Sequence, residues 1–217
     1  MGVIKIDPFI RSDQYNFIKT QTKILINGHA SGNDIDVLKA LKSLAEEKVF
    51  HLFEDTTDEQ KQLIASIVTI KEKADAETFL LQLKPYVIPF KAVTEQSIKK
   101  LFPKAKKLKV PVLEDKERKE ISYLGWHDNG SNKQYIVAPH HMKLIGLSGT
   151  FTRSNLKGIC ALCNGHEEVG MFMSEAKVSG NGTFINRGNY ICLDSQKCNQ
   201  NIITLDKLHD FMIRLSK

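Results

Sequence analysis

The sequence predicts a two-domain protein, in which an antiparallel bundle of helices is followed by a mixed α/β domain. Apolar residues recur at helical spacing through the first third of the chain, whereas short runs of aromatic and β-branched residues, separated by turns, begin at Ile121. All four cysteines lie in the last third, between residues 160 and 198. We therefore expect domains at residues 1–112 and 113–217.

Four amphipathic helices are predicted first. The apolar stripes that define them lie within residues 8–28, 35–53, 58–70 and 76–83. Asn27-Gly28 is expected to end the first helix, and Thr57-Asp58-Glu59-Gln60 has the form of a capping box in front of the third. Short helices with short connections are typical of an antiparallel bundle.

Proline-rich and lysine-rich segments follow the bundle. Residues 85–90 contain two prolines and several apolar residues, so we expect an extended strap across the bundle. A further helix is predicted from Thr94 to Phe102. The densest positive charge then falls within eleven residues that contain no acid: Lys99, Lys100, Lys104, Lys106, Lys107 and Lys109.

The net charge of the chain is +6 and its pI is about 9.0. This excess is compatible with an acidic protein partner, a nucleic acid or the ribosome, and does not choose among them. Few aromatic residues are interleaved with the lysines, which disfavours binding of single-stranded nucleic acid by base stacking. No apolar run approaches the ~18 to 20 residues of a membrane span, so we expect a soluble protein that does not bind a membrane.

The second domain is expected to be an antiparallel sheet with a terminal helix. Strands are predicted at residues 122–126, 134–137, 144–151 and 169–173, followed by a turn at 178–183 and a return strand that carries Tyr190. Thr204 is expected to cap the last helix. His127, His140 and His141 lie in or beside turns, and no carboxylate or cysteine accompanies them at ligand spacing, so we expect exposed residues there.

The cysteines form a CxxC pair, Cys160 and Cys163, and a CxxxxxC pair, Cys192 and Cys198. They could make two disulfides or hold one structural Zn²⁺ with four sulfurs. The chain opens without an apolar segment that could serve as a signal peptide, and the reducing cytosol that we therefore expect favours the metal. A turn at Asn164-Gly165, where the glycine permits a positive φ, and a helix N-terminus capped by Asp194 or Ser195 would both favour thiolate charge.

No enzyme class is favoured by the sequence. It contains no phosphate-binding glycine loop and no nucleophile elbow, and a four-sulfur zinc site leaves no open position for water. We therefore expect a binding protein with no catalytic residues.

Five blocks of the chain, taken together and in order, resemble the FusB-type fusidic acid resistance proteins, also called elongation factor G binding proteins. These blocks are Tyr86–Phe90, Lys100–Pro111, Ser122–Trp126, Lys157–Cys163 and Gly188–Cys198. The resemblance implies an N-terminal helical bundle and a C-terminal α/β domain with a four-cysteine zinc finger at residues 158–217.

The resemblance also implies a function. Members of the family bind elongation factor G, chiefly through the C-terminal domain, and promote its release from ribosomes on which fusidic acid has trapped it. This is antibiotic resistance by target protection, without chemistry on the drug. It implies a cytoplasmic monomer that reaches the ribosome indirectly through the factor and has no small-molecule substrate. The alternative is a zinc-finger protein that binds RNA or the ribosome directly through its basic surface.

The resemblance assigns two sets of residues. The zinc ligands fall on Cys160, Cys163, Cys192 and Cys198. The partner-binding surface falls on Ile159, Arg187, Tyr190 and Phe211. The family often has phenylalanine at position 159 and lysine at position 187, so Ile159 keeps apolar area without the ring and Arg187 keeps the charge. Packing around a small zinc core is the alternative role for Tyr190 and Phe211.

Overall fold

The computed structural model describes residues 6–32, 34–105, 108–177 and 184–216. Its contacts divide the chain into two units, Met1–Ile88 and Pro89–Lys217. The boundary that we expected near residue 112 therefore falls inside the second unit. The reason is that apolar side chains of residues 90–113 pack against strands of that unit.

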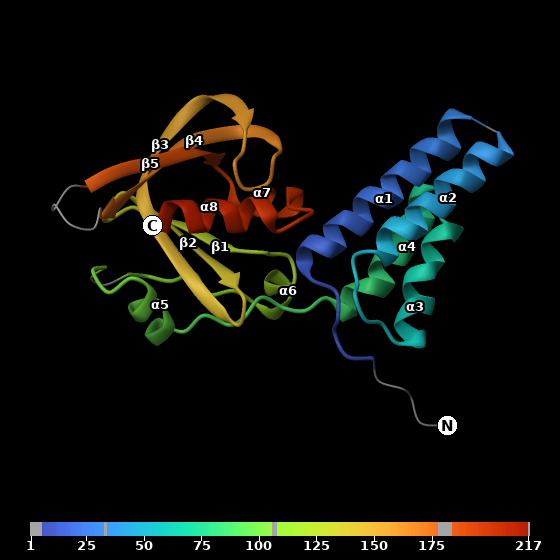
Figure 1. The fold of residues 1–217 in the computed structure, drawn as a ribbon, viewed down its shortest axis with the longest axis horizontal. Helices are drawn as coiled ribbons and strands as arrows, with labels where there is room; N and C mark the ends of the chain where they lie inside the picture. Colours follow the sequence, from blue (N-terminus) through green and yellow to red (C-terminus); the bar gives the residue numbers. More distant parts are fainter. Residues whose placement is uncertain (1–5, 33, 106–107, 178–183, 217) are drawn as a thin grey trace. The chain divides into compact units, whose positions relative to one another are not determined.

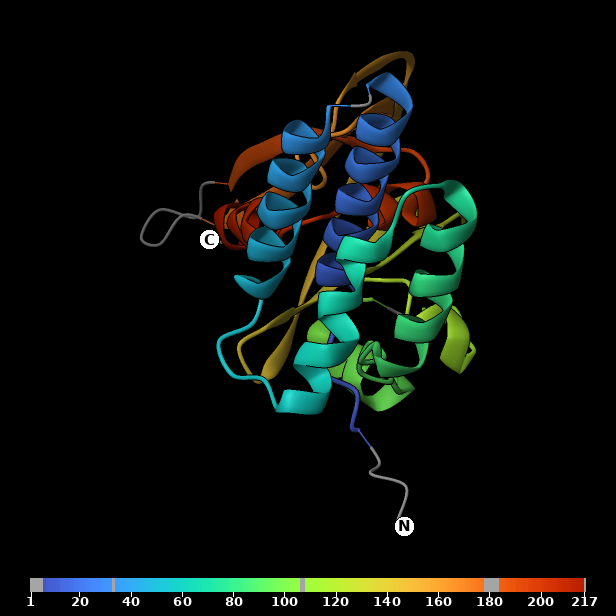
Figure 2. The ribbon, with the colours of Figure 1, turned by 90° about the vertical axis from the view of Figure 1, so that its right-hand side faces the viewer.

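The first unit is a bundle of helices, as predicted, and Figure 2 shows its helices side by side. The elements are α1 (Ser12–Ser31), α2 (Ile35–Phe50), α3 (Asp58–Ala65), the 3₁₀ turn η1 (Ser66–Thr69), α4 (Lys73–Leu83) and the 3₁₀ turn η2 (Lys84–Tyr86). Their apolar stripes meet in one core, whose fully buried members include Ile18, Val49, Ile64, Ile67 and Leu83. None of the helices in the described part of the chain has the length and apolar character needed to span a bilayer.

Gly28 does not end the first helix. We expected Asn27-Gly28 to stop it, but α1 continues to Ser31. A Cβ atom at Gly28 would lie 2.6 Å from the Cδ1 atom of Leu41 in α2. The glycine therefore allows the two helices to approach each other closely.

The extended segment after η2 is held against the start of α1. Val87 forms a parallel bridge with Ile10, and the Ile88 N–H donates to the carbonyl of Ile10 at 2.8 Å. Both Ile10 and Val87 are fully buried. Val87 of the predicted strap is thus extended and lies in the core of the first unit, whereas Pro85 and Tyr86 lie in η2 and Phe90 packs in the second unit.

The second unit is built on a five-stranded antiparallel sheet with strand order β1-β2-β3-β4-β5, so each strand pairs with its neighbour in sequence (Figure 1). Its elements are α5 (Glu95–Leu101), α6 (Asp115–Arg118), β1 (Leu124–Asp128), β2 (Lys133–His140), β3 (Lys143–Ile159), β4 (His166–Lys177), β5 (Phe184–Cys192), α7 (Ser195–Asn201) and α8 (Asp206–Ser216). Each predicted strand overlaps one of these, although β1 begins at Leu124 and not at Ser122. The turn expected at 178–183 lies outside the described residues.

Both faces of this sheet carry apolar side chains. One face packs against α8, and the core there includes Ile136, Leu147, Phe172, Leu208, Phe211 and Met212. The opposite face of β1 and β2 is covered by the segment before the sheet. Phe102 lies edge-on to Tyr135 at a centroid distance of 5.0 Å, and Tyr135 stacks on Trp126 at 5.2 Å. This aromatic cluster is why residues 90–113 belong to the second unit.

Candidate functional site, a four-cysteine metal centre

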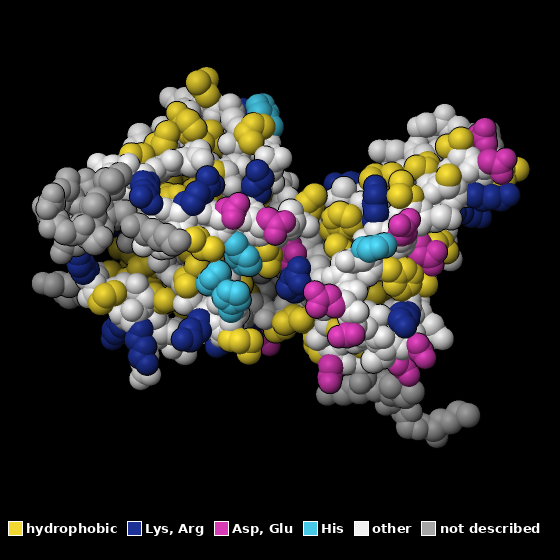
Figure 3. All heavy atoms as spheres, viewed as in Figure 1, with side chains coloured by type: hydrophobic (Ala, Val, Ile, Leu, Met, Phe, Trp, Pro, Cys, Tyr) yellow, Lys and Arg dark blue, Asp and Glu magenta, His cyan; other side chains and the backbone are white. Residues whose placement is uncertain are grey.

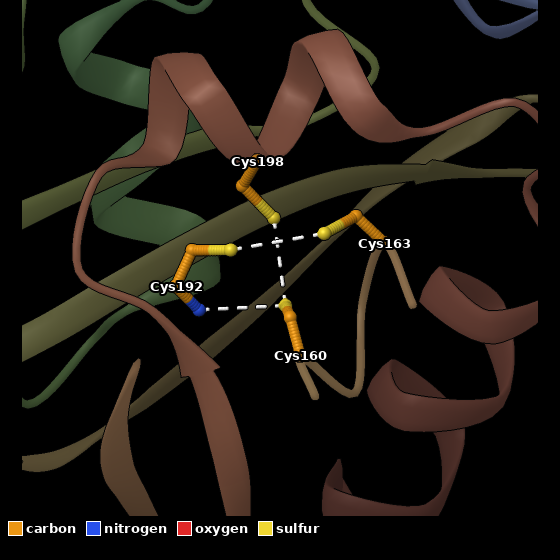
Figure 4. Close-up of side chains that lie close together, drawn as sticks. All are labelled: Cys160, Cys163, Cys192 and Cys198. Carbon is orange, nitrogen blue, oxygen red and sulfur yellow. Dashed lines mark hydrogen bonds between the residues drawn. The ribbon is translucent and has the colours of Figure 1, made fainter. Parts of the chain in front are cut away.

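The four cysteines converge from three parts of the second unit (Figure 4). Cys160 and Cys163 lie in the loop between β3 and β4, Cys192 ends β5, and Cys198 lies in α7. Their four sulfur atoms all lie within 4.8 Å of one another. The fold thus brings the two sequence-distant pairs to one point.

The sulfur spacing distinguishes a metal site from disulfides. The Sγ atoms of Cys160 and Cys198 are 3.7 Å apart, and so are those of Cys163 and Cys192. A disulfide would hold two sulfurs at about 2.05 Å. Four sulfurs at about 2.3 Å from a tetrahedral Zn²⁺ are separated by about 3.8 Å. The donor set therefore fits a structural zinc ion, and the disulfide alternative is excluded.

The loop that carries the first pair directs backbone amides at the sulfurs. Leu162 and Cys192 each donate a backbone N–H to the Cys160 sulfur at 3.4 Å, and Gly165 donates to the Cys163 sulfur at the same distance. Such hydrogen bonds stabilise thiolate charge. We expected the glycine to supply the positive φ of this turn, but Asn164 does so, with φ 58°.

Of the two predicted N-cap candidates, Asp194 caps the helix that carries Cys198. The carboxylate of Asp194 accepts the N–H groups of Gln196 at 2.8 Å and Lys197 at 3.2 Å. This capping fixes the start of α7, and the N-terminal turn of a helix favours a nearby negative charge.

The crowded sulfurs perturb one another's pKa values. Hydrogen bonds from the thiols of Cys163, Cys192 and Cys198 lower the pKa of Cys160. The hydrogen bond of Cys198 to the Cys160 sulfur, together with burial, raises the pKa of Cys198. A divalent ion at the centre would stabilise all four thiolates.

An ion pair links the start of β4 to α7 beside the cysteines. Lys197 Nζ lies 2.6 Å from a carboxylate oxygen of Glu167, and the other oxygen accepts a hydrogen bond from Asn201 Nδ2 at 3.1 Å. These contacts lower the pKa of Glu167 and raise that of Lys197. A Cβ atom on Gly165 would lie 2.9 Å from Asn201 Nδ2, so a larger residue there would displace the Asn201 amide.

Asn199 ties α7 to the chain just before β1. Its buried side chain accepts the N–H groups of Ser122 at 2.7 Å and Tyr123 at 3.1 Å, and it donates to the Tyr123 carbonyl at 3.0 Å. These bonds satisfy backbone groups of two buried residues, Ser122 and Tyr123. No sequence motif predicted this contact.

Asn199→Ala is expected to destabilise the second unit by about 2–4 kcal/mol, because two buried N–H groups would lose their acceptor. Urea unfolding followed by circular dichroism measures the change. Gln200→Ala, on the exposed side of the same helix, is the matched control and should change stability by less than about 0.5 kcal/mol. Equal stability of the two variants would contradict the role given to Asn199.

Two of the expected partner-binding residues are exposed apolar side chains beside the metal loop. Ile159, the last residue of β3, is 58% exposed, and Tyr190 in β5 is 44% exposed. The carbonyl of Tyr190 accepts the backbone N–H of Ala161 at 2.8 Å. The cysteine loop therefore fixes the backbone of Tyr190.

The other two expected residues lie elsewhere. Arg187 is exposed but is three residues from Tyr190 in the same strand, so it points to the opposite face, where its guanidinium donates to the Arg214 carbonyl of α8 at 2.9 Å. Phe211 is fully buried, with its ring 5.7 Å from that of Phe172. We expected Phe211 at the surface, but it packs beneath the sheet because it lies on the apolar stripe of α8.

Of the three histidines that we expected to be exposed, His127 and His141 are exposed, but His140 is half-buried, with its ring 5.8 Å from that of His209. Lys99, Lys100, Lys104 and Lys109 are exposed. Lys106 and Lys107 of the lysine cluster lie outside the described residues. The exposed lysines lie in and after α5 rather than beside the cysteines.

Fold and site together define a zinc-finger protein in which a loop, a strand end and a short helix supply four sulfurs, and a helical unit precedes the finger. Comparison with known families agrees. Residues 9–91 match the family model described as elongation factor G-binding protein, N-terminal, and residues 98–212 match the FBP C-terminal treble-clef zinc-finger. The chain belongs to the FusB-type family of elongation factor G-binding proteins.

A solved structure agrees with this assignment. The structure of the fusidic acid resistance protein FusC is similar to this chain with a TM-score of 0.80 and 32% sequence identity. The similarity covers 97% of this chain and 98% of that chain. A search of curated proteins gives no match.

Proposed function

We propose that this protein binds elongation factor G and promotes its release from ribosomes that fusidic acid has stalled. The observation that carries the proposal, besides family membership, is the exposed pair Ile159 and Tyr190 beside the metal centre. Exposed aromatic and aliphatic side chains on a rigid support are typical anchors of protein interfaces. The zinc ion, held by Cys160, Cys163, Cys192 and Cys198, would supply that rigidity.

The position of β5 explains how Arg187 could join the same interface. β5 is the last strand of the sheet. In the described part of the chain, no strand pairs with its outer edge. A partner placed at this edge can reach Tyr190 on one face and Arg187 on the other. Phe211 would then support the interface indirectly, because its buried side chain packs against the sheet that carries Tyr190 and Arg187.

Release of elongation factor G from the ribosome would follow if this protein binds one conformation of the factor more tightly than another. A protein that binds one conformation of elongation factor G more tightly than another shifts the factor toward that conformation. Release requires that the favoured conformation be one that the ribosome holds less tightly. The ribosome is then affected only through the factor, and the protein acts as a cytoplasmic monomer.

The proposed action is binding and not catalysis. Four sulfurs fill the tetrahedral shell of a zinc ion and leave no position at which water could be activated. Fusidic acid would therefore be unchanged, and the protein would need no small-molecule substrate.

Size-exclusion chromatography tests the proposal. Purified protein and elongation factor G, mixed at micromolar concentrations after nuclease treatment, are expected to elute as one complex with equal amounts of the two chains. Separate elution would refute binding to the factor. Release is measured next, by pelleting ribosomes that carry the factor and fusidic acid and counting the factor left in solution.

The alternative is direct RNA binding through Lys99, Lys100, Lys104 and Lys109, which are exposed. It predicts an affinity for bare ribosomal RNA that falls steeply with salt, in proportion to the number of phosphates neutralised. Complex formation that survives nuclease and shows a weak salt dependence favours the factor over RNA.

A further inference from the structure

Three histidines gather where the β2–β3 hairpin meets α8. His140 ends β2, His141 lies in the turn, and His209 lies in α8. The ring centroids of His140 and His141 are 4.3 Å apart, and those of His140 and His209 are 5.8 Å apart. Figure 3 shows histidine side chains gathered in one patch on this part of the second unit. No cysteine belongs to this cluster.

The spacing of the rings suits a shared metal ion. Two imidazoles that bind one tetrahedral ion through nitrogens at about 2.0 Å place their ring centroids about 5 Å apart. The two observed distances lie on either side of that value. Imidazole nitrogens are ligands preferred by Zn²⁺, Ni²⁺ and Cu²⁺.

His209 is held in the manner of a metal ligand. Its Nε2 atom lies 3.0 Å from the carbonyl oxygen of Pro139, which can only accept a hydrogen bond. Nε2 therefore carries the proton, and in the neutral ring Nδ1 keeps its lone pair. Metal-binding histidines usually donate their other N–H to a backbone carbonyl or a carboxylate in this way.

We propose that His140, His141 and His209 form a second metal site, separate from the cysteines, for a divalent cation that prefers imidazole. Among the described residues, only the four cysteines already have all their ligand atoms within 4.8 Å of one another. One or more imidazoles must therefore turn for all three to reach one ion, and His141 is exposed and able to do so. Water would complete the shell, which makes this an open site.

Calorimetric titration of the zinc-loaded protein with Ni²⁺ tests the site. The expected result is one binding event per chain, in addition to the zinc already held by the cysteines. In the variant His140→Gln with His141→Gln, two of three ligands are lost, and we expect the affinity for Ni²⁺ to fall at least about 100-fold. The matched control, His51→Gln with His127→Gln, removes two other exposed histidines and should bind Ni²⁺ as the wild type does.

Two outcomes would overturn the proposal. One is the absence of any Ni²⁺ binding beyond the zinc finger; the other is equal loss, or equal retention, of binding in the two double variants. Metal analysis should show one zinc ion in every protein, which excludes an effect through the finger. Imidazole NMR gives a second test on the wild-type protein, which does not depend on the folding of any variant. Ni²⁺ should broaden the signals of His140, His141 and His209 before those of His51 and His127.

Discussion

Replacing Cys192 by serine is expected to leave the purified protein without zinc and to abolish its binding to elongation factor G. The change removes one of four sulfurs from a site whose donors all lie within 4.8 Å of one another. A structural zinc ion contributes an apparent free energy of about 10–16 kcal/mol in small zinc domains, which is comparable to the whole stability of a domain. Residues 158–217 would therefore lose their fold, and Tyr190 its support.

Metal analysis and thermal unfolding measure the effect of Cys192→Ser. Gln196→Ala is the matched control, because Gln196 is exposed in α7, the helix that carries Cys198. This control should keep one zinc ion, the melting temperature of the wild type and full binding. A Cys192→Ser protein that stays folded, contains no metal and still binds the factor would show that the cysteines do not support the binding surface.

Replacing Tyr190 by alanine is expected to weaken binding to elongation factor G by about 30-fold or more, which corresponds to about 2 kcal/mol or more for an interface anchor. The side chain is 44% exposed, so its loss should change the free energy of unfolding much less than it changes binding. Tyr190→Phe keeps the ring and should retain most of the affinity. Calorimetry with purified factor gives the dissociation constants.

Met142→Ala is the control for this prediction. Met142 is 90% exposed in the hairpin between β2 and β3, away from the metal loop, and its loss should leave the affinity unchanged. Wild-type affinity in Tyr190→Ala would remove Tyr190 from the proposed interface. It would leave intact the binding of the factor itself, which chromatography tests separately.

Phe211 requires a different interpretation from Tyr190. Because its side chain is fully buried, Phe211→Ala is expected to lower stability by about 3–5 kcal/mol. A loss of binding in this variant would therefore come with a loss of fold. The pair Tyr190→Ala and Phe211→Ala is informative only when binding and stability are measured on each variant separately.

The sequence predicted those features that depend on local pattern. The helical stripes, the strands and the N-cap at Asp194 follow from the periodicity of apolar residues and from capping chemistry, and the structure confirms them. The cysteine spacing likewise predicted a single zinc site, because few other arrangements use four cysteines in a reducing compartment. The full burial of Phe211 agrees with the alternative role of packing, whereas the family resemblance placed that residue at the partner-binding surface.

Features that depend on contacts between distant residues were not predicted. The acceptor role of Asn199 toward Ser122 and Tyr123 leaves no local signal, because a buried asparagine resembles an exposed one in sequence. Gly28 resembles a helix stop, and only the packing of Leu41 shows why it lies inside a helix. The unit boundary differs from the expected residue 112 because the apolar residues of the segment 90–113 pack on the sheet, a contact that the sequence pattern does not show.

The order of the strands in the sheet bears on how the chain folds during synthesis. Because every strand pairs with its neighbour in sequence, the hairpins can form one after another as the chain leaves the ribosome. The metal ion cannot be enclosed until Cys198 has emerged, and α8 follows only after that residue. Zinc uptake and docking of α8 therefore complete the unit as its last step, and until then one apolar face of the new sheet stays open to water.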